Sequence, residues 1–422
     1  MNLPAPRVLL SAYHCAPGMG SVSQIGWEWY SRLVKKVQVS LITHVRNRDA
    51  LLQAGAPLAN SEIIFIDTEW FAKPLYWLAS KLFPKDEDTR FFFSSFDFYL
   101  YDWVAVRQMK MRQKAGAQWD IIHAVTPVSP IALTRLYVLN HPLILGPWNG
   151  GLKFTKAFPE IMRQEHSWLH FIRRLGRLVG LIVRSTKNAA IILTATEATL
   201  QSISARYRSR CRPFLENGVN LDLFTPVPWP TPPSSTLPLC IVFVGRFVAF
   251  KGIPMLLEAI ACLKDRFPIK LTLVGDGPLR EQWENHAKNL HINHLITWFG
   301  SASLTQVVEQ IQAAHVLCLP SVRESGGAVL LEAMACARPV LTIKYGGPGE
   351  IADNEVGYVI PPEGGPIAVT KALVNSLSDI FEHPEVWRQR GETGRQRAER
   401  LYSWDSKINQ ALSLYQELLQ TQ

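Results

Sequence analysis

The stretch LPSVRESGGAVLLEAM, residues 319–334, decides how the rest of the chain is interpreted. It begins at the end of an apolar run typical of a buried strand, and Pro320-Ser321 ends that strand. A loop over residues 323–327 follows, and residues 328–336 have the composition of a helix. Gly326 and Gly327 precede the helix, where backbone N–H groups can approach an anion that the helix dipole favours. The stretch therefore predicts a strand, an anion-binding loop and a helix.

Two carboxylates accompany this loop. Glu324 lies within it, and Glu332 lies eight residues later inside the helix. An isolated carboxylate beside an anion site would repel the anion, so we expect these two groups to accept hydrogen bonds from hydroxyl groups instead. A nucleotide sugar offers both phosphate and hydroxyl groups, so the stretch predicts a nucleotide-sugar site.

Length and composition describe a folded protein that suits two domains. The chain has 422 residues, of which 47% are hydrophobic and 19% charged. No apolar run reaches the roughly 18 residues that cross a bilayer, and the N-terminus is interpreted as a first strand rather than a signal peptide. Six scattered cysteines without a C-x2-C pair predict neither disulfides nor structural zinc, and they favour a cytoplasmic location.

The net charge of +9 indicates anionic partners, such as nucleotide diphosphates or an acidic membrane. Nucleic acid is not expected, because the Lys and Arg residues are dispersed and no DNA-binding motif is present.

Short β-rich apolar runs alternate with helical patterns, which predicts an α/β protein with parallel sheets. The expected strands are 8–12, 37–43, 63–67, 121–124, 143–146, 191–194, 214–216, 239–245, 270–275, 296–299, 316–319 and 340–342. The Pro-rich stretch 225–238 has no periodicity and predicts an interdomain linker. An amphipathic helix is expected over residues 404–419. Ligands are expected at the carboxyl ends of the strands.

Four motifs of the C-terminal half resemble those of retaining glycosyltransferases of family 4. They are Glu324-x7-Glu332, VFVGRFVAFKG (242–252), LTLVGDGPLR (271–280) and GGPGEIADNEVGYVIPP (346–362). The resemblance implies the GT-B fold, in which two Rossmann-like doubly wound domains face each other across a cleft. The implied segments are an acceptor-binding domain at 1–224, the linker 225–238, a nucleotide-sugar-binding domain at 239–385, and C-terminal helices at 386–422 that pack back on the first domain.

The donor site follows partly from chemistry and partly from this resemblance. Arg246 ends a strand and Lys251 follows five residues later, so both can hold a diphosphate. The helix start would complete the diphosphate site with Gly326, Gly327 and Ala328. By resemblance, Glu324 acts in catalysis by holding hydroxyls of the donor sugar, and Glu332 holds the ribose. Phe299 and Gly300 would help to seat the base.

The loop after the first strand, CAPGMGSVSQIGWEW (15–29), has the wrong glycine spacing for a NAD site. It resembles the N-terminal loop of a family 4 subgroup, which implies that Gly18, Gly20 and Ser21 face the acceptor. Ala16 and Val22 replace the acidic residues of that pattern, and a turn shaped by glycine alone is the alternative.

His123 lies at the end of the strand 121–124. The resemblance implies a catalytic histidine that faces the transferred sugar across the cleft. The alternative is a hydrogen-bonded structural histidine.

Three further segments have open interpretations. Asp86-Glu87-Asp88 imitates a metal-binding D-x-D motif, but it lacks a strand before it and is expected to be a solvated turn. The aromatic stretch 91–103 predicts core packing together with an acceptor groove or a membrane-facing patch. The Arg-rich stretch 163–187 predicts either a helix on an anionic membrane or a helix packed on the sheet.

The sequence thus predicts a hexosyltransferase that moves a sugar from a UDP-sugar or GDP-sugar to a lipid-linked, glycan or small-molecule acceptor. The resemblance implies retention, with the leaving diphosphate taking the acceptor proton. No metal and no cofactor are expected, and a peripheral position on the inner face of the membrane is a further expectation. The alternatives are a nucleotide-sugar epimerase or hydrolase, and a non-catalytic subunit that binds membrane or a partner.

Overall fold

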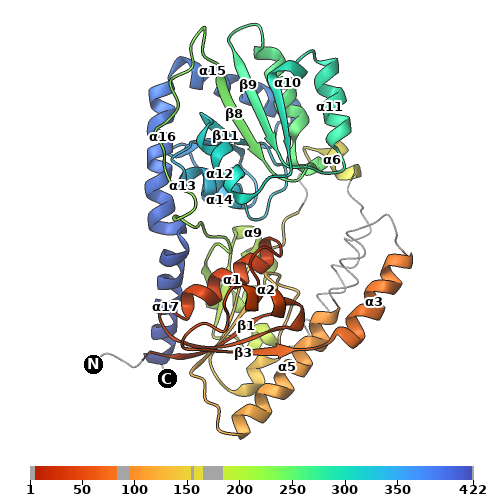
Figure 1. Ribbon diagram of the computed structural model, residues 1–422, viewed down its shortest axis with the longest axis vertical. Helices are drawn as coiled ribbons and strands as arrows, with labels where there is room; N and C mark the ends of the chain where they lie inside the picture. The colour runs from red at the N-terminus through yellow and green to blue at the C-terminus, as the bar shows by residue number, and fades with distance from the viewer. Residues whose placement is uncertain (1–4, 83–95, 154–155, 165–183, 421–422) are drawn as a thin grey trace. The chain divides into compact units, whose positions relative to one another are not determined.

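The structure is a computed structural model that describes residues 5–82, 96–153, 156–164 and 184–420. The chain divides into two compact units (Figure 1). The first unit comprises Met1–Gly151, Ser167–Glu216 and Lys407–Gln422, and the second comprises Leu152–His166 and Asn217–Ser406. Both units are therefore discontinuous in sequence.

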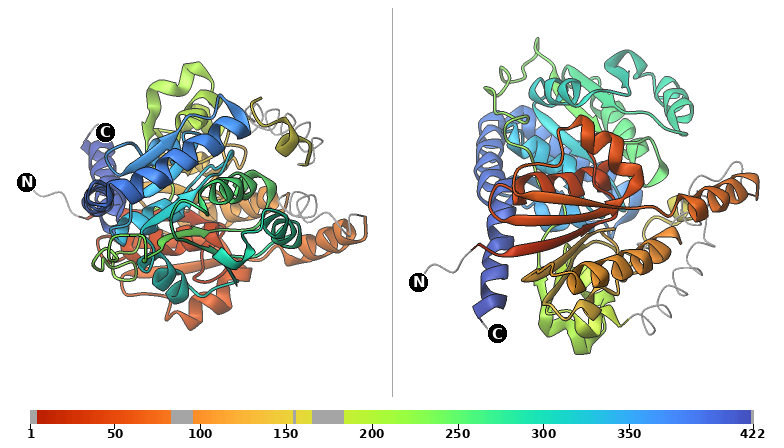
Figure 2. Two further views of the ribbon diagram at one scale, coloured as in Figure 1. Left: turned by 90° about the horizontal axis from the view of Figure 1, so that it is seen from above. Right: turned by 60° about the horizontal axis from the view of Figure 1, so that its bottom comes forward.

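A parallel sheet forms the centre of the first unit, with the strand order β3-β2-β1-β4-β5-β6-β7. The right-hand view of Figure 2 shows its red and orange strands side by side. Apolar residues of the central strands, such as Leu9, Ile122 and Ile144, are fully buried, as expected for a parallel sheet covered on both faces. The strands are β1 (Arg7–Ala12), β2 (Gln38–His44), β3 (Ser61–Ile66), β4 (Ile121–Thr126), β5 (Leu143–Trp148), β6 (Ile191–Thr194) and β7 (Cys211–Pro213).

Helices connect these strands. The α-helices that lie wholly within the first unit are α1 (Ser21–Leu33), α2 (Arg48–Gln53), α3 (Glu69–Leu82), α5 (Asp97–Lys114), α8 (Ser185–Asn188) and α9 (Glu197–Ser202). The 3₁₀ helices are η1 (Val45–Asn47), η2 (Leu136–Leu139) and η3 (Ala205–Arg210). Among the described residues, no helix is both long and apolar enough to cross a membrane. The six cysteines are free.

The second unit has a parallel sheet with the strand order β10-β9-β8-β11-β12-β13. Its strands are β8 (Leu239–Val244), β9 (Ile269–Val274), β10 (Ile296–Gly300), β11 (Val316–Leu319), β12 (Val340–Ile343) and β13 (Gly357–Ile360). The helices are α6 (Pro159–Gln164), η4 (Ala249–Lys251), α10 (Ile253–Leu263), α11 (Arg280–Asn289), η5 (Asn293–Leu295), α12 (Leu304–Gln312), α13 (Ala328–Ala335), α14 (Gly347–Ile351), α15 (Gly365–Glu382), α16 (Pro384–Arg397), the π-helical η6 (Ala398–Tyr402) and the first residues of α17 (Trp404–Gln420).

The two sheets share one topological feature. In each, the first strand pairs with the fourth, so β1 lies beside β4 and β8 lies beside β11. The connections leave these neighbouring strands in opposite directions along the sheet. Such a switch point opens a crevice at the carboxyl ends of the strands, where doubly wound proteins bind ligands.

The Pro-rich stretch 225–238 is part of the second unit. The Trp229 indole donates a hydrogen bond to the His315 carbonyl (3.0 Å), and His315 is within hydrogen-bonding distance of the Thr231 carbonyl (2.9 Å). The buried Arg338 guanidinium donates to the carbonyls of Val227 and Pro228 at 3.2 and 3.0 Å. These bonds hold the stretch against the body of the unit, although its sequence predicted only a linker.

The last helix returns to the first unit, as predicted. Residues Lys407–Gln422 belong to that unit, and the buried Tyr415 of α17 lies against His123 of β4. At the start of this segment the Lys407 ammonium donates to the Leu215 carbonyl and lies 4.1 Å from the centroid of the Phe214 ring. The last helix therefore contacts the first unit through Lys407 and through Tyr415.

Candidate functional site

Three loops meet at the carboxyl ends of β8, β11 and β12, the middle of the second sheet. A Cβ atom on Gly252 would lie 2.1 Å from the Pro320 carbonyl oxygen, and one on Gly346 would lie 2.1 Å from that of Glu324. Only glycine allows the backbones to approach so closely. The Val322 amide donates to the Phe250 carbonyl (2.8 Å), which also joins the first two loops. The loop of residues 320–327 is therefore fixed between its two neighbours.

Lys251 and Glu324 form an ion pair within this cluster. The Lys251 ammonium donates to Glu324 Oε2, and the side chains are only 14% and 17% exposed. The sequence predicted a phosphate ligand and a hydroxyl ligand at these positions, and the structure brings them together. A partly buried ion pair keeps both charges in place at the switch point between β8 and β11.

The start of α13 borders the ion pair. Gly326 and Gly327 are buried, Gly327 precedes the first helical residue, and Ala328 opens the helix. The first turn of any α-helix leaves backbone N–H groups without intrahelical partners, which favours an anion at this position. Arg246 follows β8 by two residues and is exposed. These residues place positive potential around Lys251 and Glu324.

Glu332 lies inside α13 and differs from Glu324. Its carboxylate makes no hydrogen bond or ion pair with any residue in the described part of the chain. Burial raises the pKa of Glu332 to about 7, because water is largely removed and no cation compensates. A carboxylate in this state is well suited to hydroxyl groups, which would supply the missing hydrogen bonds.

Phe299 and Gly300 lie at the carboxyl end of β10 and are partly exposed. The Gly275 amide after β9 donates to the Gly300 carbonyl (2.8 Å), and the Gly245 amide after β8 donates to the Val274 carbonyl (2.9 Å). These bonds link the ends of the three strands, so the residues predicted to lie near a base share the edge that holds Lys251.

In the first unit, Gly18, Gly20 and Ser21 are exposed in the turn that leads into α1. Gly20 is the residue before the helix, and Ser21 is its first residue. The turn lies at the carboxyl end of β1, the edge where ligands bind in such sheets.

His123 occupies a different environment from the one predicted. Its side chain is fully buried in β4, where Nδ1 lies 2.6 Å from the Tyr415 hydroxyl and Nε2 lies 2.7 Å from the Gly146 carbonyl. The Trp29 ring packs edge-on at 4.8 Å between centroids. Burial lowers the pKa of His123 to about 4. The resemblance implied a ring that faces the transferred sugar, whereas the buried ring with both nitrogens engaged matches the alternative of a hydrogen-bonded structural histidine.

The sequence did not reveal a network of polar side chains at the carboxyl edge of the first sheet. The fully buried Asp97, at the start of α5, accepts hydrogen bonds from Tyr13 (2.8 Å), Thr68 (2.6 Å) and Arg46 (3.1 Å). Arg46 also donates to Glu69. These residues come from four segments of the sequence, so no single motif contained them. The available signal was that Tyr13 directly follows a predicted strand.

No group of three or more His, Cys, Asp or Glu residues that could hold a metal ion occurs in the described ranges. Asp86-Glu87-Asp88 and residues 165–183 of the Arg-rich stretch lie outside those ranges. Part of the aromatic stretch is described: Phe98 and Tyr101 are buried in the core, and Trp103 is 48% exposed.

Solved structures resemble the whole chain in fold. Sucrose-phosphate synthase from Thermosynechococcus elongatus superposes with a TM-score of 0.65 at 20% identity, covering 99% of this chain and 100% of that one. Alr3699/HepE from Anabaena, in complex with UDP, gives 0.62 at 16% identity, with 98% and 100% covered. WaaG, a glycosyltransferase involved in lipopolysaccharide biosynthesis, gives 0.59 at 18% identity, with 97% and 99% covered. Two Rossmann-like units with a returning last helix define the GT-B fold.

Residues 233–396 match the profile of the glycosyl transferases group 1. Curated relatives include D-inositol 3-phosphate glycosyltransferase of Corynebacterium glutamicum, 28% identical over 42% of this chain and 43% of the relative. N-acetyl-alpha-D-glucosaminyl L-malate synthase of Bacillus anthracis is 27% identical over 42% of this chain and 45% of the relative. The chain thus spans under half the length of these relatives.

Proposed function

We propose that the protein is a retaining glycosyltransferase that moves a sugar from a nucleoside diphosphate sugar to a hydroxyl group of an acceptor. One observation carries the proposal: the Lys251–Glu324 ion pair lies beside the start of α13 and at the switch point of the second sheet. This arrangement offers cationic groups to a diphosphate and carboxylates to hydroxyls at one edge.

In this proposal Arg246, Lys251 and the N–H groups of residues 326–328 bind the diphosphate and stabilise the charge that develops as it leaves. Glu332 accepts hydrogen bonds from the ribose hydroxyls, and Glu324 from hydroxyls of the donor sugar. Phe299 and Gly300 contribute to the base site. The departing diphosphate oxygen takes the proton of the acceptor hydroxyl, so the reaction needs no separate base and no metal ion.

His123 is not part of the proposed chemistry. A ring with no exposed surface and with both nitrogens hydrogen-bonded cannot contact a substrate unless β4 and α17 separate. We assign it a positioning role, because it ties the last helix and the Gly146 carbonyl to the centre of the first sheet.

The donor class has support from one structural neighbour. The Anabaena protein Alr3699/HepE was solved with UDP, with UDP and glucose, and with UDP-glucose. UDP-sugars are therefore the first donors to test, followed by GDP-sugars.

A thermal-shift screen against UDP, GDP, ADP and their sugars tests donor binding, because a ligand at 100 times its Kd stabilises the folded state by about 2.7 kcal/mol. We expect one nucleotide series to raise the Tm of the wild type and to lose that effect in Lys251→Ala. Release of free sugar or an epimer without acceptor would instead favour the hydrolase or epimerase. No response to any nucleotide would favour a non-catalytic subunit.

We also propose that the protein works in the cytoplasm at the surface of an anionic membrane. Helix α3, which projects from the first unit in Figure 1, exposes Trp70 (69%), Trp77 (59%) and Leu82 (62%). Aromatic residues of this kind favour the membrane interface. The exposed face of α5 carries Trp103, Arg107, Lys110, Met111 and Lys114. Cations beside exposed apolar groups suit anionic lipid.

Vesicle co-sedimentation tests this location. The wild type should bind phosphatidylglycerol vesicles at low salt and phosphatidylcholine vesicles weakly, since charge attraction is screened by salt. Arg107→Glu, Lys110→Glu and Lys114→Glu together should abolish the difference. Equal binding to both vesicles by the wild type would contradict the proposal.

A further inference from the structure

His14 follows β1 by two residues, and its backbone is fixed from two sides. Its amide donates to Thr126 Oγ1 (3.0 Å), and the Thr126 hydroxyl donates to the His14 carbonyl (2.8 Å). On the other side, α1 passes so closely that a Cβ atom on Gly26 would lie 2.1 Å from the His14 carbonyl oxygen. The position of the ring is therefore set by β4 and α1 together.

The imidazole of His14 is half-buried and makes no hydrogen bond with any residue of the described chain. Its neighbour is the Tyr13 ring, which meets it edge-on with 4.6 Å between centroids. Tyr13 is itself held by its hydrogen bond to Asp97. His14 thus presents two unpaired ring nitrogens from a rigid support, at the edge where ligands bind in this class of sheet.

The charges around His14 decide its protonation state. Burial, together with the nearby Arg46 and His44, lowers the pKa of His14 to about 4, while Asp97 acts in the opposite direction. At neutral pH the ring is uncharged, so one nitrogen donates and the other accepts. A hydroxyl group, which can also donate and accept, is the matching partner.

The same network also limits the charge of the ligand. Arg46 is paired with both Asp97 and Glu69, and the exposed Lys73 lies 3.8 Å from Glu69. His44 lies 3.4 Å from Asp97, and burial lowers its pKa as well. Two cations, Arg46 and Lys73, thus face two carboxylates, so the network has no excess positive charge. A phosphate group would therefore find no net attraction here, whereas an uncharged polyol needs none.

We infer that His14 binds a hydroxyl group of the acceptor, and that the part of the acceptor bound at this edge is an uncharged sugar or polyol. This inference rests on the proposed function, and it assigns a substrate class and an acceptor-binding residue to the first unit. His14 positions the acceptor; the proton still passes to the donor diphosphate.

Binding of small probes tests the inference on the full chain. Saturation-transfer NMR is measured with methyl glycosides of glucose, galactose and mannose, with myo-inositol, and with glucose 6-phosphate. We expect at least one uncharged probe to bind better than glucose 6-phosphate. His14→Ala should weaken that binding about tenfold or more, because the hydroxyl loses its partner. His14→Asn, which keeps a neutral donor and acceptor, should recover part of it.

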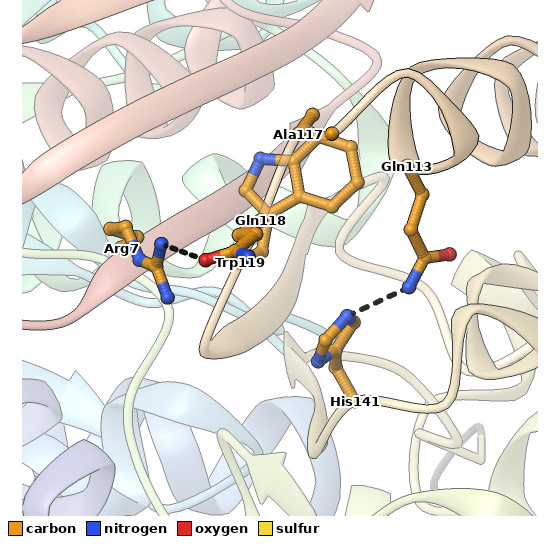
Figure 3. A pocket seen from close by; sticks show the side chains of 7 residues that line it. Arg7, Gln113, Ala117, Gln118, Trp119 and His141 are labelled. Carbon is orange, nitrogen blue, oxygen red and sulfur yellow. Dashed lines mark hydrogen bonds between the residues drawn. The ribbon is translucent and has the colours of Figure 1, made fainter.

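His141 provides a matched control. It is also partly exposed, and burial also lowers its pKa. It lines a pocket of about 390 Å³ at the opposite, amino end of the same sheet, beside Gln113 and Trp119 (Figure 3). His141→Ala should leave probe binding unchanged.

Three results would overturn the inference: binding of the phosphorylated probe alone, equal binding by wild type and His14→Ala, or no binding of any uncharged probe. Thermal shifts with UDP and GDP, measured on the same variants, distinguish failure of this inference from failure of the proposed function. His14→Ala should retain the nucleotide response, whereas a wild type without any nucleotide response would count against the proposed function alone.

Discussion

The carboxyl edges of the two sheets have the same topology but are built differently. In the second unit, Lys251 and Glu324 follow the neighbouring strands β8 and β11, Glu332 lies on α13, and each belongs to a short sequence motif. In the first unit, the polar network joins Tyr13, Arg46 and Asp97 from distant segments. Under the proposed function, this difference means that the donor site concentrates its residues in short motifs, whereas the acceptor site is assembled from many elements.

The largest effect should come from Glu324→Gln in the second unit. Loss of the carboxylate removes a hydrogen-bond acceptor that the proposal assigns to the transition state, and turnover should fall by about 10²- to 10³-fold. Steady-state kinetics measure this, with Glu392→Gln, whose partner is the exposed Arg388, as a control for removing a carboxylate. Near-normal turnover in a folded Glu324→Gln variant would contradict the assignment.

Lys251→Ala should lower turnover by about 10²-fold, because the leaving diphosphate loses a charge-assisted hydrogen bond in a partly buried site. Wild-type transfer should continue in excess EDTA, and added Mn²⁺ should not rescue the variant. Activity that disappears with EDTA and returns with Mn²⁺ would instead indicate a metal site. Asp86-Glu87-Asp88 would then be the candidate metal ligands.

Gly252 and Gly18 allow the two edges to be compared by stability. Both have a left-handed backbone, with φ of 68° and 72°, but an added Cβ would meet the Pro320 carbonyl at Gly252 and nothing within 4 Å at Gly18. Gly18→Ala should cost about 1 kcal/mol from backbone strain alone. Gly252→Ala should cost about 2 kcal/mol more, since the loops must separate. Denaturant unfolding measures both; equal losses would mean that the loop contact is not rigid.

The smallest effect concerns the raised pKa of Glu332. If the ionised carboxylate binds the ribose hydroxyls, affinity for the nucleotide sugar should increase by about tenfold from pH 6 to pH 8. Glu332→Gln should remove this dependence. A carboxyl pKa raised by folding also lowers stability as pH rises from the unfolded value of 4.5 to about 7. The variant should therefore gain stability relative to wild type over that range, and a constant difference would contradict a raised pKa.

Most of the fold could be predicted because buried parallel strands appear as short apolar runs. Strands at the edges of the sheets were harder to predict. β13 (Gly357–Ile360) is four residues long, lies at the edge of its sheet and was not predicted. β7 forms at Cys211–Pro213 rather than at residues 214–216. Such short strands are defined by pairing with a neighbour rather than by their own pattern.

The donor residues of the site could be proposed from motifs, but their environment could not. The proximity of Lys251 to Glu324 depends on the packing of two loops, and the burial of His123 depends on a helix almost 300 residues later in the chain. The network around Asp97 was missed for the same reason, since contacts between distant segments leave no local pattern.

The return of α17 to the first unit sets the order in which the protein can be completed during synthesis. The first unit lacks Lys407–Gln422 until the entire second unit has been translated, roughly ten to forty seconds after Glu216 at typical ribosomal rates. Until then, His123 has no Tyr415 and Leu215 has no Lys407. The N-terminal unit, although made first, therefore finishes folding last. A chain truncated after Ser406 should contain an incompletely folded first unit and a complete second unit.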